Sequence, residues 1–263
     1  MIDNFPLKGL GTYKLLGSSC TDNVLFALEN GVKLIDTASF YENEKAVGNA
    51  ISQTTIKREA FQITTKMWTD EMRSSTAENS LLKSLDKLQT DYVDYYLVHW
   101  PVKEKWQYAY EQMLVLQQKG LVKKVGVCNC AEAHLREIKD SFGSYPFLNQ
   151  IEAHPNFQQK EMQQFCKDHA IQMQSWRTLM FGEVETLTDL KGIAEKYEKS
   201  VYQVALKFFV QNGVGVIPKS SSKSRILENF NIDDFQLSTQ DLQRISELDK
   251  NERNGPHPNN FDF

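Results

Sequence analysis

Short apolar runs alternate with amphipathic runs along most of the chain, and this alternation limits the fold more than any other feature. The apolar runs recur at an interval of about thirty residues, the length of one βα unit. Short apolar segments of this kind are typical of strands in a sheet that is covered on both faces. The predicted strands are a short segment around Gly11 and residues 34–36, 61–66, 93–99, 124–129, 147–152, 171–176 and 213–219.

Helices are predicted between these strands. The clearest pattern puts Ala77, Leu81, Leu85 and Leu88 on one apolar stripe, because residues at these spacings share a helix face. The sequence Ser75-Thr76-Ala77-Glu78 precedes the stripe with the spacing of a capping box. The other predicted helices are residues 22–30, 44–52, 104–118, 131–140, 160–169, 200–211, 225–230 and 239–248.

Eight strands in alternation with helices predict an α/β fold, a (β/α)8 TIM barrel, as one domain over residues 1–263. No polar linker or low-complexity run marks a boundary within it. A doubly wound dinucleotide fold is the main alternative, but its G-x-G-x-x-G turn is absent. Gly9-Leu10-Gly11 continues as Thr12-Tyr13-Lys14, and Gly213-Val214-Gly215 does not continue correctly either.

Charge and cysteine content exclude several classes of function. A net charge of −4 and a pI of about 5.8 argue against a nucleic-acid or anionic-membrane surface, because both need a basic field. The chain has no long apolar run and no apolar signal core, so a cytoplasmic protein is expected. Its four cysteines are too scattered for a disulfide framework, and no His or Cys near Cys128 and Cys130 completes a metal site.

Four residues suited to proton transfer lie at or just after the ends of three predicted strands. Asp36 ends one predicted strand and Tyr41 follows it, while Lys66 and His99 end the next two. Each residue also has a purely structural interpretation. Asp36 could cap a helix and Tyr41 could lie at the edge of the core. Lys66 could extend its ammonium into solvent, and His99 could be a core histidine. Together they form a proton donor for a carbonyl oxygen, in which Lys66 lowers the phenol pKa from about 10 and His99 orients the oxygen. This arrangement lacks a reductant, so a cofactor is required.

The chain resembles the aldo-keto reductase family. The resemblance runs from about Gly11 to Asn229 and rests on successive motifs in the expected order: GVKLIDTASFYENE, ITTKMW, SLDKLQTDYVDYYLVHWP, KKVGVCN, NQIEAHP and IPKSSSKSRILEN. It implies a (β/α)8 barrel that binds NADPH/NADP+ and reduces aldehydes or ketones to alcohols. It also implies that Asp36, Tyr41, Lys66 and His99 are the catalytic tetrad, with Tyr41 as the proton donor.

The resemblance also implies a set of cofactor contacts. Asn129 and Gln150 match positions that hold the nicotinamide carboxamide, a task for which amides offer both a donor and an acceptor. Trp176 stands where a tyrosine usually stacks on the nicotinamide. A clamp for the 2′-phosphate, with cations that favour NADPH over NADH, and adenine contacts beside it are implied at Lys219, Ser220, Arg225, Glu228 and Asn229. Further cofactor contacts are expected from Gly11, Thr12, Asp36, Arg177 and Leu179.

Three positions depart from the family pattern. Cys128 replaces a serine that commonly contacts the carboxamide, and a thiol is a poorer hydrogen-bond partner. Cys130 stands where an aromatic residue is usual. Arg177-Thr178 replaces the expected Ser-Pro, so that Arg177 either reaches the pyrophosphate or is a surface arginine.

For the substrate, Tyr41, Trp68, His99 and Trp100 are the expected contacts, with Phe40 nearby; Trp106 is either part of the pocket wall or core. A small aldehyde, an α-dicarbonyl or a keto sugar acid each fits such a site. The alternative function is a cofactor-binding regulatory barrel with little turnover. By resemblance, a monomer is expected whose partner is a small-molecule carbonyl substrate.

Overall fold

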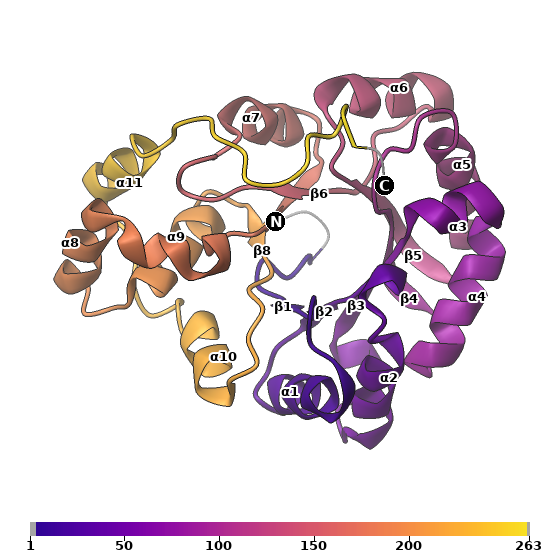
Figure 1. Cartoon of the computed structure of the whole chain (residues 1–263), viewed down its shortest axis with the longest axis horizontal. Coiled ribbons are helices and arrows are strands. Elements are labelled where there is room, and N and C mark those ends of the chain that lie inside the picture. Colours follow the sequence, from indigo (N-terminus) through magenta and orange to yellow (C-terminus); the bar gives the residue numbers. More distant parts are fainter. Residues whose placement is uncertain (1–3, 262–263) are drawn as a thin grey trace.

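The computed structural model describes residues 4–261. Its strands form one parallel sheet in chain order (Figure 1). The backbone amides of Gly9 and Gly11 donate to Val216 O (2.9 Å) and Pro218 O (3.2 Å), which closes the sheet into a barrel. The predicted (β/α)8 barrel is therefore confirmed. The strands are β1 (Leu10–Gly11), β2 (Leu34–Asp36), β3 (Gln62–Met67), β4 (Val93–Val98), β5 (Val122–Cys128), β6 (Leu148–Glu152), β7 (Gln172–Trp176) and β8 (Gly215–Val216).

Helices surround the barrel and cover the outer face of the sheet (Figure 1). The α-helices are α1 (Gly17–Glu29), α2 (Glu44–Gln53), α3 (Thr69–Ser74), α4 (Ala77–Leu88), α5 (Trp106–Gln118), α6 (Glu132–Phe142), α7 (Lys160–Asp168), α8 (Thr188–Lys196), α9 (Val201–Gln211), α10 (Lys223–Phe230) and α11 (Thr239–Ser246). The part of the chain that the structure describes also has the 3-10 turns η1 (Ser39–Tyr41), η2 (Arg58–Ala60) and η3 (Met180–Thr186). Within the described residues, no helix is both long enough and apolar enough to cross a membrane.

Helix α8, the short helix α3 and the cap of α4 differ from the predictions. Helix α8 was missed because Gly192 lies inside it and weakens its helical signal. Helix α3 begins where Glu71 Oε2 accepts a hydrogen bond from Trp68 N at 2.8 Å. The cap of α4 is Thr76, whose Oγ1 accepts from Asn79 N at 3.2 Å, so the predicted capping box ending at Glu78 is not formed.

The barrel interior has an apolar lower layer and a polar upper layer. Phe5, Leu34, Leu97 and Leu148 belong to one buried cluster. Because side chains alternate between the two faces of a strand, the residues two positions later also point inward. Those residues are Asp36, His99 and Gln150. The alternation that packs the interior thus also places the polar groups at the carboxyl ends of the strands.

The last described segment returns to the barrel mouth. After α11 the chain runs past α7 and β6 toward β5 (Figure 1). Lys250 N donates to Asn156 O at 2.9 Å, and the ring of Phe261 lies 5.0 Å from that of Trp100. Residues far apart in the sequence therefore share this face of the molecule.

We expect Gly48→Ala to lower the free energy of unfolding by about 1–3 kcal/mol. Gly48 lies in α2, where an added Cβ would collide with Lys87 O and with the backbone of Leu88 at the end of α4. Urea unfolding would measure the loss. Gly192→Ala is the matched control, because a Cβ on Gly192 in α8 meets nothing within 4 Å; it should gain up to about 1 kcal/mol in helix propensity. Equal effects of both substitutions would contradict the close approach of α2 and α4.

Candidate active site

A buried ammonium group lies at the centre of the barrel mouth. Lys66, at the end of β3, is 0% exposed. Its Nζ donates to Asp36 Oδ1 at 2.6 Å, to Thr37 O at 2.9 Å and to Tyr41 Oη at 3.2 Å. The three donors of the ammonium therefore all have acceptors. The structure brings Asp36, Lys66 and Tyr41 together, as the sequence predicted.

Lys66 carries its positive charge in this setting. Burial by itself lowers the pKa of Lys66, but the Asp36 carboxylate and the Tyr41 phenol raise it, and the net pKa lies above the usual value for lysine. The carboxylate of Asp36 is 2.6 Å from the ammonium and is itself buried. A buried charge of this kind persists only when it is paired and hydrogen-bonded.

The pKa of Tyr41 differs from the prediction. Burial raises the pKa of Tyr41 to about 12, Lys66 opposes this rise, and Asp36 adds to it. The predicted net lowering by Lys66 is wrong, because loss of solvent around the phenol outweighs the nearby cation. The phenol is therefore protonated at neutral pH and is available as a proton donor.

His99 completes the group from the end of β4. It is 7% exposed, and its ring lies 5.7 Å from the Tyr41 ring in an edge-on arrangement. Burial lowers the pKa of His99 well below its usual value, and the Lys66 cation lowers it further. The imidazole is neutral and keeps one N–H donor. Its Nδ1 is buried and has no hydrogen-bond partner among the described residues.

Asn129, just after β5, and Trp176, at the end of β7, are joined by a hydrogen bond. Trp176 Nε1 donates to Asn129 Oδ1 at 2.9 Å, and Asn129 Nδ2 donates to His99 O at 3.1 Å. Asn129 has a φ of 58°, in the left-handed region that asparagine tolerates. Trp176 is only partly buried, so part of its indole is available to a flat ligand.

Gln150 is tied into the catalytic layer. Its Nε2 donates to Asp36 Oδ2 at 2.7 Å and to Gln174 Oε1 at 2.7 Å. Both amide hydrogens are thus used, and Oε1 has only a weak contact with Cys128 Sγ at 3.9 Å. Gln150 therefore presents its acceptor rather than its donors to a ligand. Gln174 was not predicted; its signal is a polar residue two positions before Trp176, on the same face of β7.

Most of the remaining predicted cofactor residues belong to the segments around β1 and after β8. Thr12 N and Oγ1 both donate to Asp36 O, at 3.0 Å and 2.9 Å. Gly11 leaves no room for a side chain, because an added Cβ would lie 2.6 Å from Ile217 O. Lys219 and Arg225 are exposed and form no ion pair with any carboxylate of residues 4–261. Ser220 and, in α10, Asn229 are buried, and Glu228 in the same helix is partly buried. Leu179 is partly buried and precedes η3.

Arg177 is not a surface arginine. Its Nη1 lies 3.7 Å from Glu152 Oε1, and its side chain is only 17% exposed. The guanidinium also lies over the ring of Phe181, 4.3 Å from the centroid. Phe181 itself is 72% exposed. Arg177 therefore links the end of β6 to the kinked turn η3 at the mouth.

Aromatic side chains wall the space next to His99. The ring of Trp68 stacks on Phe40 at 3.8 Å and meets the edge of His99 at 4.9 Å. Trp100 is buried and contacts Phe261. Trp106 is 3% exposed and belongs to the outer core, so its core interpretation is correct.

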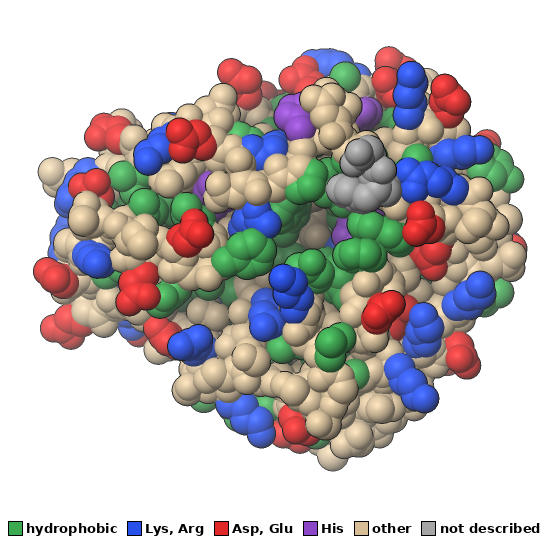
Figure 2. All heavy atoms as spheres, in the orientation of Figure 1, with side chains coloured by type: hydrophobic (Ala, Val, Ile, Leu, Met, Phe, Trp, Pro, Cys, Tyr) green, Lys and Arg blue, Asp and Glu red, His purple; other side chains and the backbone are tan. Residues whose placement is uncertain are grey.

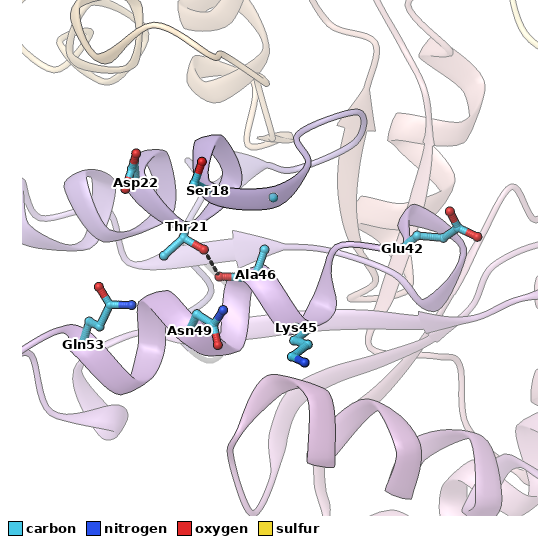
Figure 3. A pocket seen from close by; sticks show the side chains of 9 residues that line it. Ser18, Thr21, Asp22, Glu42, Lys45, Ala46, Asn49 and Gln53 are labelled. Carbon is cyan, nitrogen blue, oxygen red and sulfur yellow. Dashed lines mark hydrogen bonds between the residues drawn. The ribbon is translucent and has the colours of Figure 1, made fainter.

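The molecular surface agrees with this placement. Figure 2 shows a hollow at the centre of the barrel face, rimmed by hydrophobic and basic side chains. A second groove of about 520 Å³ lies between α1 and α2, where Thr21 Oγ1 donates to Ala46 O at 2.9 Å (Figure 3). None of the predicted site residues lines this second groove. The chemistry is concentrated at the barrel mouth.

Comparisons with known proteins show which family the chain resembles. A model of the aldo/keto reductase family matches residues 18–250. The chain is 40% identical to a glyoxal reductase of Bacillus subtilis (98% of this chain, 94% of the relative). It is also 40% identical to the methylglyoxal reductase DkgA of Escherichia coli (97% and 94%). The crystal structure of a Gox0644 variant in complex with NADPH superposes with a TM-score of 0.93 at 34% identity, covering 98% of this chain and 95% of the other.

We expect Asp36→Ala to cost about 3–5 kcal/mol of unfolding free energy, because it leaves the Lys66 ammonium buried without its carboxylate. Adding Lys66→Met should recover part of the loss, since the uncompensated charge is then removed. Urea unfolding of both single variants and of the double variant would measure the coupling. A double variant that loses the sum of the two single losses would contradict a strongly coupled pair.

Proposed function

The chain belongs to the aldo/keto reductase family, and we propose that its substrates are small α-dicarbonyls of the glyoxal and methylglyoxal kind. The protein is an NADP-dependent oxidoreductase that reduces aldehydes or ketones to alcohols. The names of the two bacterial relatives support the narrower substrate class. The observation that carries the proposal is the buried chain Asp36–Lys66–Tyr41 next to neutral His99, at a mouth walled by Phe40 and Trp68.

The alternative of a regulatory barrel with little turnover is not favoured. The two bacterial relatives are named as reductases, and the chain matches 94% of the length of each. The four residues of the expected tetrad also lie together, with Tyr41 protonated and its oxygen bonded to Lys66. Such an arrangement has a direct use in proton transfer.

In the proposed mechanism, Tyr41 gives its proton to the carbonyl oxygen. Bound NADPH would supply the hydride for the carbonyl carbon. Lys66 donates to the Tyr41 oxygen at 3.2 Å and stabilises the negative charge that develops there as the proton leaves. Asp36 keeps Lys66 in place. The N–H of neutral His99 orients the substrate oxygen, and Trp68, Trp100 and Phe40 limit the pocket to small substrates.

The residues present fit the cofactor. We propose that Trp176 stacks on the nicotinamide and that Gln150 Oε1, whose Nε2 is already engaged, accepts a hydrogen bond from the carboxamide. Asn129 is proposed to join this contact, although its Oδ1 accepts from Trp176 here. The exposed cations Lys219 and Arg225, with Ser220, suit the 2′-phosphate. Glu228 and Asn229 are proposed for the adenine, and Gly11, Thr12, Arg177 and Leu179 for the rest of the dinucleotide.

We also propose that the whole chain is one domain that works as a cytoplasmic monomer on a small carbonyl compound, without a nucleic-acid partner. Within residues 4–261, the closed sheet joins β1 (Leu10–Gly11) to β8 (Gly215–Val216), which lie far apart in the sequence. All four cysteines are free and buried, as is usual in a reducing compartment. A net charge of −4 disfavours nucleic acid.

We expect methylglyoxal and glyoxal to be reduced with a higher kcat/KM than keto sugar acids or bulky aldehydes. Tyr41→Phe should lower kcat by about 10²–10⁴-fold, because general acid catalysis is lost, while NADPH still binds. The pH profile has a defined sign. Reduction needs the protonated phenol, so its rate should fall only as the pH rises toward the Tyr41 pKa of about 12; the reverse oxidation, which needs the phenolate, should increase with pH.

NADPH absorbance would follow these reactions, and fluorescence titration would report cofactor binding. Equal turnover in Tyr41→Phe and the parent would exclude Tyr41 as the donor. Tight NADPH binding without turnover of any carbonyl would instead favour the regulatory alternative.

The preference for NADPH should depend on Lys219 and Arg225. Each charge-assisted contact with phosphate is worth about 1.5–3 kcal/mol, so Lys219→Ala and Arg225→Ala should each raise KM for NADPH at least about tenfold and leave KM for NADH nearly unchanged. Lys223→Ala is the matched control, because Lys223 lies over the ring of Phe26 at 5.2 Å. Parallel losses with both cofactors would contradict a 2′-phosphate clamp.

A further inference from the structure

Glu152 is a fully buried carboxylate that the proposed mechanism does not use. It ends β6 and is 0% exposed. Oε2 lies 3.3 Å from Arg253 Nη1, and Oε1 lies 3.7 Å from Arg177 Nη1 and 3.4 Å from His154 Nε2. Two guanidinium groups from distant parts of the chain therefore share one carboxylate.

Glu152 also binds the backbone of the C-terminal segment. Asn254 N donates to Oε1 at 2.8 Å, and Gly255 N lies 3.0 Å from both carboxylate oxygens. Burial would raise the pKa of Glu152, but the hydrogen bond with His154, the two backbone amides and Arg253 lower it below the usual value. The ionised carboxylate thus fixes residues 253–255, which we call the strap.

The strap lies against the indole of Trp176 so closely that only glycine fits. A Cβ added to Gly255 would lie 2.6 Å from Trp176 Cη2, 3.3 Å from Trp176 Cζ3 and 2.8 Å from Glu152 Oε2. Another edge of the same indole donates to Asn129 Oδ1 through Nε1. Trp176 is therefore fixed at two edges, by Asn129 and by Gly255.

We propose that the strap, anchored by Glu152, is a positioning element for Trp176 and thereby sets the affinity for NADPH. The inference rests on the proposed function, in which Trp176 stacks on the nicotinamide. It assigns Gly255, Arg253 and Glu152 a role in cofactor binding through the indole. None of the three touches the reacting atoms in this role.

The strap lies beside the proposed cofactor site, whereas Phe261, later in the chain, lies beside the proposed substrate site. Phe261 contacts Trp100 on the substrate side of the mouth, whereas the three atoms nearest to a Cβ added at Gly255 belong to Trp176 and Glu152. A role in substrate binding would change KM for the carbonyl compound. A role through Trp176 changes the affinity for NADPH.

The test is Gly255→Ala, with Gly192→Ala as the control for a glycine that has free space. Stacking of an aromatic side chain on a flat base is worth enough that displacing the indole should raise Kd for NADPH about tenfold. The value of kcat at saturating NADPH should change less than about threefold, since Tyr41 and Lys66 are not touched. Fluorescence titration gives Kd, and steady-state kinetics separates kcat from KM.

A double-mutant cycle makes the test specific for Trp176. Phenylalanine lacks the outer indole atoms that meet Gly255, so Gly255→Ala should cost less than about twofold in Kd when added to Trp176→Phe. Glu152→Gln should act in the same direction as Gly255→Ala, and Glu252→Gln, at an exposed neighbour of the strap, should have no effect.

The outcomes separate this inference from the proposed function. If Trp176→Phe alone leaves Kd for NADPH unchanged, the stacking role of Trp176 fails and the inference fails with it. If Trp176→Phe weakens binding and Gly255→Ala does not, only the role of the strap is overturned. Equal costs of Gly255→Ala in both backgrounds, or a change confined to the substrate KM, would also overturn it.

Discussion

The site depends on burying a single ammonium group without loss of its charge. Lys66 is removed from solvent, and this would be very costly if any of its donors lacked an acceptor. Asp36, the carbonyl of Thr37 and the phenol of Tyr41 supply three acceptors from one short stretch that begins at the last residue of β2. The same contacts that satisfy the cation hold Tyr41 in position. Stability and proton transfer therefore rely on the same few atoms.

The barrel makes this burial possible because alternation along the strands separates two layers. Leu34, Leu97 and Leu148 fill the lower interior, and Asp36, His99 and Gln150 lie two residues later on the same strands. The apolar layer excludes water from below, which strengthens the interactions among the polar groups. The apolar layer and the polar layer above it thus both follow from the alternation of side chains along the strands.

Much of this arrangement was readable in the sequence. Strand periodicity placed Asp36, Lys66 and His99 at neighbouring strand ends, because that signal depends only on local order. The net pKa of Tyr41 was not readable, because it depends on how fully the surrounding fold removes water. The Glu152 contacts join β6 to residues about a hundred positions later, and no local spacing records such a pairing. Helix α8 was not predicted because Gly192 weakens its local helical signal, whereas the helix is stabilised by tertiary packing.

Closure of the barrel through Gly9, Gly11, Val216 and Pro218 has a consequence for how the protein is made. Ribosomes extend chains from the N-terminus, so Asp36 and Lys66 emerge long before the strand that closes the sheet. An ion pair that water can reach contributes little to stability, so burial of Asp36 and Lys66 in the closed barrel matters for their interaction. The last strand to be synthesised, β8, thus completes a barrel whose paired charges, Asp36 and Lys66, belong to the first third of the chain.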